Sequence, residues 1–192
     1  MSRFEKVGIG DAKARLDNYP HQLSGGIAQR VMVALAVALE PVVLIADEPT
    51  SSLDVTVQAQ VLDLLQSLVS EMDMAMVLIT HNLAVAVTLA DRIAVMYAGK
   101  LLEIGPAREV YEDPGHPYTA ALLRSIPSLQ SKPRRLPVIT GAPPSLLRRP
   151  AGCVFHPRCP HAQQRCIDAV PPLVQIATER WSACIRIDEI DP

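Results

Sequence analysis

The stretch from residue 23 to residue 54, LSGGIAQRVMVALAVALEPVVLIADEPTSSLD, constrains the fold of this 192-residue chain more than any other. It joins a Ser-Gly-Gly turn, an apolar run that ends in two carboxylates, and a polar turn that ends in Asp54. Apolar residues from Ile27 to Ala38 recur at helical spacing, so we expect a helix capped by Ser24. The unpaired N–H groups of a helix start suit a phosphate, and glycines let it approach the backbone closely. By itself, however, a Ser-Gly-Gly turn more often marks an ordinary capped helix.

An apolar run and two acidic residues follow this helix. Pro41 ends the helix, because proline lacks an N–H and pushes the preceding residue out of the α region. Residues 42–46 are all apolar, which is typical of a short strand buried on both faces. Asp47 and Glu48 come next, and such a pair is costly to bury unless it binds something. Because side chains alternate along a strand, one carboxylate would support Mg²⁺ and the other would face a water as general base. The alternative is a solvated loop.

The pattern after Asp54 is typical of an α/β protein. Apolar residues at Val57, Val61 and Leu65 predict a helix with one buried face. Residues 75–80 predict a second buried strand, and His81 follows it directly, in the same layer as the two carboxylates. Most single histidines are structural or solvated, but this position favours a function. Further along, we expect a helix at 83–90, a hairpin of strands 92–97 and 100–104, and short helices at 107–111 and 118–125.

The C-terminal part has a different composition. Residues 127–150 are rich in proline and arginine, which predicts an extended linker. Residues 151–192 contain all four cysteines of the chain: Cys153, Cys159, Cys166 and Cys184. Clustered cysteines in a cytosolic chain indicate metal or redox chemistry, and thiolates bind zinc or iron–sulfur clusters. The spacing contains no CxxC pair, although His156 and His161 are further candidate zinc ligands. The prolines of this part suggest a loop-dominated fold.

The strings LSGGIAQR, LIADEPTSSLD and LITHN together resemble the ABC-transporter ATPase family. This resemblance implies an α/β fold, the distal part of a P-loop ATPase domain with a mixed sheet flanked by helices. It implies a signature motif that contacts the γ-phosphate of ATP held by an opposite subunit: Ser24, Gly25 and Gly26. Gln29 in the same string and Asp54, in the loop that crosses the dimer interface, are also assigned to the nucleotide site.

The same resemblance assigns the catalytic groups. Asp47 matches the aspartate that supports Mg²⁺, Glu48 the glutamate that polarises the attacking water, and His81 the histidine that contacts the γ-phosphate. The chain departs from the family pattern at Ile27-Ala28, where Met-Arg is usual, and at Asn82, where Asp is usual. Neither departure removes a group assigned to catalysis.

The 192 residues contain no Gly-rich phosphate loop ending in Gly-Lys-Ser/Thr, whose amides and lysine cradle the phosphates in this family. We therefore expect a truncated ATP-binding subunit of an importer for peptides or similar small solutes, inactive alone. One alternative is a non-enzymatic partner that lends its signature helix to a complete subunit. Another is the inactive product of a broken gene.

The strings HPYTAALLRSIP and GCVFHPRCPHAQQRC resemble the peptide- and nickel-importer branch. The resemblance implies a four-iron–four-sulfur cluster on the four cysteines, while zinc or no metal remain alternatives. The expected domains are a partial ATPase domain at 1–126, the linker at 127–150, and a cysteine-containing tail at 151–192.

Charge and hydropathy restrict the partners. The net charge of −2 gives no indication of nucleic-acid binding. No apolar run reaches the roughly 20 residues that span a bilayer, and the N-terminus lacks a signal-peptide core. We expect a peripheral protein on the cytoplasmic face of the membrane. The family implies an identical or homologous second ATPase subunit, transmembrane permease subunits and, indirectly, an extracytoplasmic solute-binding protein.

Overall fold

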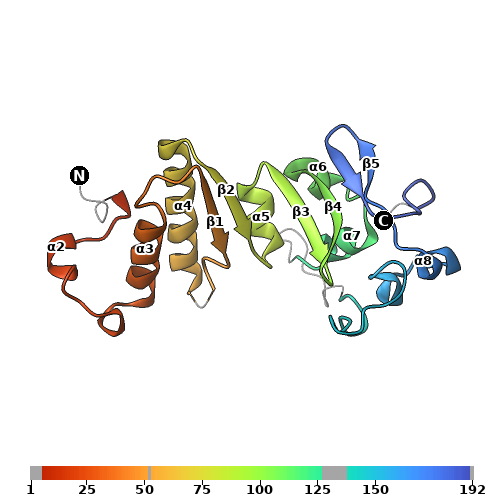
Figure 1. Cartoon of the computed structure of the whole chain (residues 1–192), viewed down its shortest axis with the longest axis horizontal. Coiled ribbons are helices and arrows are strands. Elements are labelled where there is room, and N and C mark those ends of the chain that lie inside the picture. Colours follow the sequence, from red (N-terminus) through yellow and green to blue (C-terminus); the bar gives the residue numbers. More distant parts are fainter. Residues whose placement is uncertain (1–5, 52, 127–137, 191–192) are drawn as a thin grey trace. The chain divides into compact units, whose positions relative to one another are not determined.

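The computed structural model describes residues 6–51, 53–126 and 138–190. The chain divides into two compact units, Met1–His81 and Asn82–Pro192. Each unit combines helices with strands, so the expected α/β class is confirmed (Figure 1).

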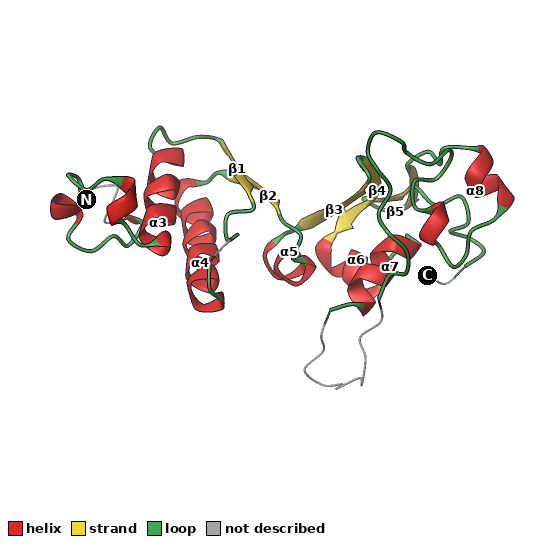
Figure 2. Cartoon of the chain, turned by 90° about the horizontal axis from the view of Figure 1, so that it is seen from below, coloured by secondary structure: helices red, strands yellow, loops and turns green. Residues whose placement is uncertain are grey.

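The first unit packs helices on a two-stranded parallel sheet. Strands β1 and β2 pair in parallel, with Asp47 opposite Ile79. Helices α3 and α4 lie side by side (Figures 1 and 2). The elements, in order, are α2 (Ala12–Arg15), the 3-10 helix η1 (Pro20–Gln22), α3 (Gly25–Ala36), β1 (Val43–Asp47), α4 (Val55–Met72) and β2 (Ala75–Ile79).

Local sequence explains where α4 begins and ends. Asp54 is its N-cap, and the Asp54 carboxylate accepts a hydrogen bond of 3.0 Å from the Val57 N–H. The helix ends at Met72, and the next residue, Asp73, is its C-cap with a left-handed φ of 48°. These two acidic residues therefore fix the length of the longest helix in the unit.

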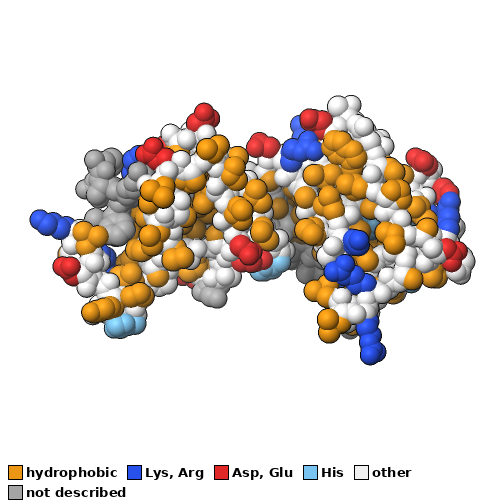
Figure 3. Space-filling view, viewed as in Figure 1, with side chains coloured by type: hydrophobic (Ala, Val, Ile, Leu, Met, Phe, Trp, Pro, Cys, Tyr) orange, Lys and Arg blue, Asp and Glu red, His pale blue; other side chains and the backbone are white. Residues whose placement is uncertain are grey.

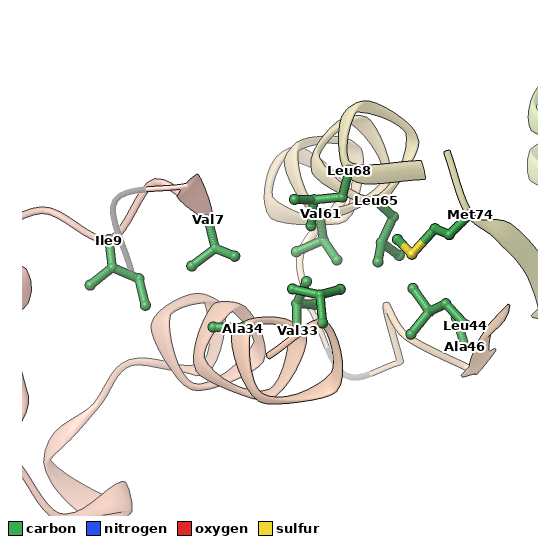
Figure 4. Packing of buried hydrophobic residues seen from close by; sticks show 11 residues of the cluster. Val7, Ile9, Val33, Ala34, Leu44, Ala46, Val61, Leu65, Leu68 and Met74 are labelled. Carbon is green, nitrogen blue, oxygen red and sulfur yellow. The ribbon is translucent and has the colours of Figure 1, made fainter. Parts of the chain in front are cut away.

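The core of the first unit lies between the two long helices and one face of the sheet (Figure 4). Val61, Leu65 and Leu68 of α4 are at most 2% exposed and pack with Leu44 and Ala46 of β1. Burial of such a side chain stabilises the fold by about 1.5–3 kcal/mol. Further members of this cluster come from α3 and from residues before it: Val7, Ile9, Val33, Ala34 and Val37.

The prediction that the strands are buried on both faces is wrong. Residues alternate between buried and exposed along β1, and β2 alternates between half-buried and exposed. The exposed row consists of Val43 (51%), Ile45 (67%), Val77 (50%) and Ile79 (48%). Helices α3 and α4 pack against the other face, and within the described residues this row has no covering element. Figure 3 shows exposed hydrophobic side chains over this unit.

The second unit is built on a four-stranded antiparallel sheet of order β3-β4-β6-β5. The expected hairpin is confirmed, with strands β3 (Arg92–Tyr97) and β4 (Lys100–Pro106). The other elements are α5 (Leu83–Leu89), α6 (Ala107–Glu112), α7 (Pro117–Arg124), the 3-10 helix η2 (His156–Arg158), α8 (Gln164–Asp168), β5 (Val174–Ala177) and β6 (Arg180–Ser182).

The tail is less loop-dominated than expected. Its hairpin β5–β6 joins the sheet, because Trp181 pairs with Ile104 of β4. The connection between β5 and β6 contains Glu179 at a left-handed φ of 56°. Residues 127–137 of the expected linker lie outside the described residues, and 138–150 contain no helix or strand. The three-part division at 126 and 150 stays a prediction.

An aromatic cluster joins the tail to the hairpin of β3 and β4. Phe155 is 1% exposed and packs edge-on against Tyr97, with ring centroids 5.5 Å apart. His116 is also buried, and its Nδ1 accepts a hydrogen bond of 3.0 Å from the Tyr118 N–H. Burial lowers the pKa of His116 to about 4, so this imidazole is neutral at neutral pH.

A buried ionic cluster fixes the position of β6. Glu103 of β4 is fully buried and accepts a hydrogen bond of 2.6 Å from the Gly115 N–H. Burial raises the pKa of the Glu103 carboxyl, although the nearby Arg180 guanidinium, 3.5 Å away, acts in the opposite direction. Arg180 also contacts Asp113 at 3.1 Å, so that one arginine links β6 to β4 and to the connection between α6 and α7.

Candidate functional site

The Ser-Gly-Gly turn opens α3, as predicted, but its serine does not cap the helix through its side chain. Ser24 is at the N-cap position with an extended backbone, and its hydroxyl makes no capping hydrogen bond. A Cβ added to Gly26 would lie 3.0 Å from Val57 Cγ1 of α4. The absence of a side chain at Gly26 therefore lets the starts of α3 and α4 pack closely. This role adds to the expected one, which is to let a phosphate approach the backbone. Ser24 itself is exposed at this helix start.

The two carboxylates lie where β1 ends. Asp47 is the last residue of the strand and is exposed. The Glu48 N–H donates to the Ile79 carbonyl at 2.9 Å, which extends the pairing of β1 with β2 by one residue. Glu48 has a left-handed φ of 46°, which is uncommon for a residue other than glycine. Residues in such strained conformations occur frequently at functional sites.

The structure brings Glu48 and His81 together. The Oε1 atom of Glu48 lies 2.8 Å from His81 Nδ1 and accepts the His81 N–H at 3.0 Å. The parallel register places both residues just past the same end of the paired strands. Their side chains are accessible, 35% exposed for Glu48 and 84% for His81. A carboxylate oriented in this way and open to solvent is suited to accept a proton from water.

The remaining predicted residues occupy separate places. Asp54 caps α4, so its carboxylate has a structural partner. Gln29 is half-buried in α3. Gln58 is a residue that the sequence reasoning missed: its amide donates to the Thr50 and Leu53 carbonyls at 3.2 Å each and so holds the turn before α4. Its place one helical turn after Asp54 is the signal that could have pointed to it. Ser52, within this turn, lies outside the described residues.

Magnesium and thiolate centres require different donors. In the described residues, no group of three or more His, Cys, Asp or Glu side chains is placed to hold a metal ion. The oxygen donors Asp47 and Glu48 nevertheless fit Mg²⁺, which usually takes one or two carboxylates together with substrate phosphates and waters.

All four cysteines line one pocket in the second unit. They are free thiols, and the Cys153 N–H donates to the Cys166 carbonyl at 2.8 Å. Burial raises the pKa of Cys153, Cys184 and Cys159, in the last case to about 11, and the neighbouring thiols act in the same direction. The pocket is also lined by Phe155, Arg186 and three histidines: His116, His156 and His161. Thiolates are donors for zinc and for iron–sulfur clusters, but among the described residues these four side chains are not placed as a metal-holding group.

Two family models match the chain. Residues 2–51 match the model described as "ABC transporter", and residues 102–166 match "Oligopeptide/dipeptide transporter, C-terminal region". The chain belongs to the ABC-transporter ATP-binding family. The first match contains the signature turn and both carboxylates, and the second contains three of the four cysteines.

Three relatives with 47–50% sequence identity to this chain are named as ATP-binding proteins of peptide import or transport. A putative peptide import ATP-binding protein of Brucella ovis is 49% identical over 193 residues, which cover 97% of this chain and 57% of the relative. The dipeptide transport ATP-binding protein DppD of Escherichia coli is 50% identical, with 94% of this chain and 55% of DppD covered. The oligopeptide transport ATP-binding protein OppD of Salmonella typhimurium is 47% identical, with 95% of this chain and 54% of OppD covered. The chain thus spans little more than half the length of these relatives.

A solved structure supports the fold of this ABC-family chain. The protein CbiO1 of Clostridium perfringens, described as part of the ABC transporter complex CbiONQ, matches 58% of this chain and 43% of its own. The TM-score is 0.52 and the sequence identity is 31%. The expected fold, the distal part of a P-loop ATPase domain, is confirmed.

Proposed function

We propose that the chain provides the signature turn, the magnesium-supporting aspartate and the catalytic base of an ATPase that energises the import of peptides or similar small solutes. The observation that carries this proposal is the contact between Glu48 and His81 directly after Asp47, at one end of two parallel strands. Open α/β sheets bind their ligands beyond the carboxyl ends of their strands.

Each proposed role follows from the position of its side chain. Glu48 accepts a proton from the water that attacks the γ-phosphate, and His81 orients that carboxylate through its ring and its N–H. Asp47 holds Mg²⁺, which neutralises phosphate charge when it is bound. Ser24, Gly25 and Gly26 open α3 toward solvent and donate to the γ-phosphate of a nucleotide held by a second ATPase subunit. Gln29 and Asp54 belong to the same interface.

A second candidate function is a non-enzymatic partner that completes the site of another subunit. The observation that favours it is the position of the signature turn, which opens α3 with Ser24 and Gly25 exposed. Such a chain would present its signature turn to a complete ATPase and would hydrolyse nothing at its own carboxylates.

Turnover of ATP distinguishes these functions. We expect no magnesium-dependent turnover by the 192-residue chain, and turnover by a hybrid in which the same residues follow the phosphate-loop half of DppD. The hybrid supplies the cradle that the chain lacks, so activity there supports the proposed role of Glu48 and His81. An inactive, folded hybrid that still stimulates a complete subunit would favour the partner function. Turnover by the chain alone, lost on Glu48→Gln, would refute the expectation for the chain.

The proposed partners are those of a peripheral subunit: a second ATPase subunit, identical or homologous, and the permease subunits of an importer. In the described residues no helix is long and apolar enough to cross a membrane. We propose that such permease subunits attach the chain to the cytoplasmic face of the membrane.

We also propose that Cys153, Cys159, Cys166 and Cys184 bind a four-iron–four-sulfur cluster. Their shared pocket supports this assignment, and metal binding would require the thiolate form of each ligand. Zinc, which four cysteine thiolates also bind, is the alternative metal.

Metal content tests this assignment. Anaerobically purified protein should contain about four iron atoms per chain, with a broad visible absorption from sulfur-to-iron charge transfer. Replacement of Cys166 with serine should remove most of both signals, because it takes away one of four ligands. Stoichiometric zinc in protein without iron would overturn the cluster assignment.

A further inference from the structure

Arg186 lines the same pocket as the four cysteines and connects two of the segments that carry them. Its side chain is 15% exposed, and its Nη1 group donates to the His161 carbonyl, two residues after Cys159. Arg186 itself follows Cys184 by two residues. This one guanidinium therefore links the segments of Cys159 and Cys184.

Glu189 extends the connection to a third cysteine. Its Oε2 atom accepts a hydrogen bond of 3.1 Å from Arg186 Nε and another from the Nη2 group of Arg165. Arg165 lies in α8 directly before Cys166. The ionic row Arg165–Glu189–Arg186 thus joins α8 to the segment around Cys184. The hydrogen bond from Arg186 to the His161 carbonyl connects the row to the segment of Cys159.

Backbone contacts connect the fourth cysteine to this arrangement without an ion pair. The Cys153 N–H donates to the Cys166 carbonyl, and the His156 N–H donates to the Cys153 carbonyl at 3.0 Å. Cys153 is therefore placed through the backbone of α8, which is itself held by Arg165. Of the residues in the ionic row, only Arg186 lines the pocket.

The charge of Arg186 also suits a thiolate centre. Four thiolates place several negative charges in a buried pocket, where water stabilises them less than in bulk solution. An adjacent cation offsets part of this negative charge. Addition of an electron to a metal cluster increases the negative charge further, so a nearby cation raises the reduction potential.

We propose that Arg186 is a positioning residue of the four-cysteine centre, which brings the cysteine segments together and supplies positive charge to their thiolates. The electrostatic half of this inference depends on the proposed cluster, whereas the positioning half concerns the metal-free chain as well. The two halves have separate measurements.

The experiment compares the chain with Arg186→Gln, Arg186→Lys and the control Arg108→Gln. Arg108 forms an exposed pair with Glu112 at 2.8 Å in α6 of the same unit, and neither residue lines the pocket. In the metal-free, reduced chain, Arg186→Gln should speed amide hydrogen exchange in the segments of Cys159, Cys166 and Cys184 about tenfold, because these segments open to solvent more often. Arg186→Lys, which keeps the charge but donates in fewer directions, should give an intermediate rate.

In iron-loaded protein, Arg186→Gln should lower the reduction potential and Arg186→Lys should restore most of it, because the charge is retained. A purely structural arginine would not give this rescue. Circular dichroism shows whether each variant is folded; if Arg186→Gln is not, the lysine variant carries the comparison. Unchanged exchange rates in folded Arg186 variants would overturn the inference. Faster exchange in Arg186→Gln, together with a parent chain that never binds iron, would support positioning and refute the cluster proposal alone.

Discussion

Replacement of Glu48 with glutamine should lower ATP turnover by about 10²–10⁴-fold in a complete protein that carries these residues. Glutamine keeps the shape of the side chain and an oxygen that can accept the His81 N–H, but it cannot take a proton from water. The substitution therefore separates base chemistry from folding. The measurement is steady-state phosphate release by the DppD hybrid, with nucleotide binding followed in parallel.

The matched control for this substitution is Glu71→Gln, an exposed carboxylate near the end of α4. It should leave turnover within about twofold of the parent, because isolated surface charges contribute little. If Glu48→Gln also stayed within that range, the proton would have another acceptor and the proposed role of Glu48 would be lost.

Replacement of Gly152 with alanine should destabilise the second unit by about 2–5 kcal/mol. Gly152 has a left-handed φ of 65°, and a Cβ there would lie 2.3 Å from the Cys166 carbonyl oxygen and 2.5 Å from that of Ile167. Both contacts are with backbone, so rotation of a side chain cannot relieve them. The expected result is a lower midpoint in urea, followed through the fluorescence of Trp181, the single tryptophan of the chain.

Gly141→Ala is the control for the backbone conformation alone. Gly141 has a φ of 79°, but the nearest atom to an added Cβ is Arg158 Cγ at 3.5 Å, an ordinary contact. Its cost should stay near 1–2 kcal/mol, roughly that of a left-handed alanine. Equal effects at both glycines would mean that the segment of Cys153 can move away from α8 at little cost.

Local sequence was sufficient for most elements of the fold. The turn at Ala98-Gly99 acts within a few residues, so the hairpin could be predicted from the local sequence. The end of α3 was predicted less well, because the helix ends at Ala36 and has Val37 as its C-cap, before the expected stop at Pro41. The Asp54 cap of α4 was not predicted. The β5–β6 hairpin was missed because its strands are short, and its pairing with β4 joins residues about 78 apart in the chain. Such pairing depends on long-range packing that short sequence windows do not contain.

The candidate site was predictable as a set of residues but less so as geometry. His81 and Glu48 were expected in one layer, whereas the shared oxygen and the left-handed Glu48 follow from the register of two strands. Burial on both faces was inferred from an apolar run, but composition does not say whether a covering element is present. The network around Arg186 was not foreseen either, because arginines in a tail normally read as solvated charges.

The half-exposed strands of the first unit also bear on how long the chain survives in a cell. A two-stranded sheet is at the lower limit of independent stability, and an apolar row in water resembles the surface of a partly folded protein. Chaperones and proteases act on surfaces of that kind, and small differences in stability change abundance several-fold. The amount of this protein in a cell would therefore depend on how completely other protein segments cover Val43, Ile45, Val77 and Ile79. This dependence is separate from any effect on catalysis.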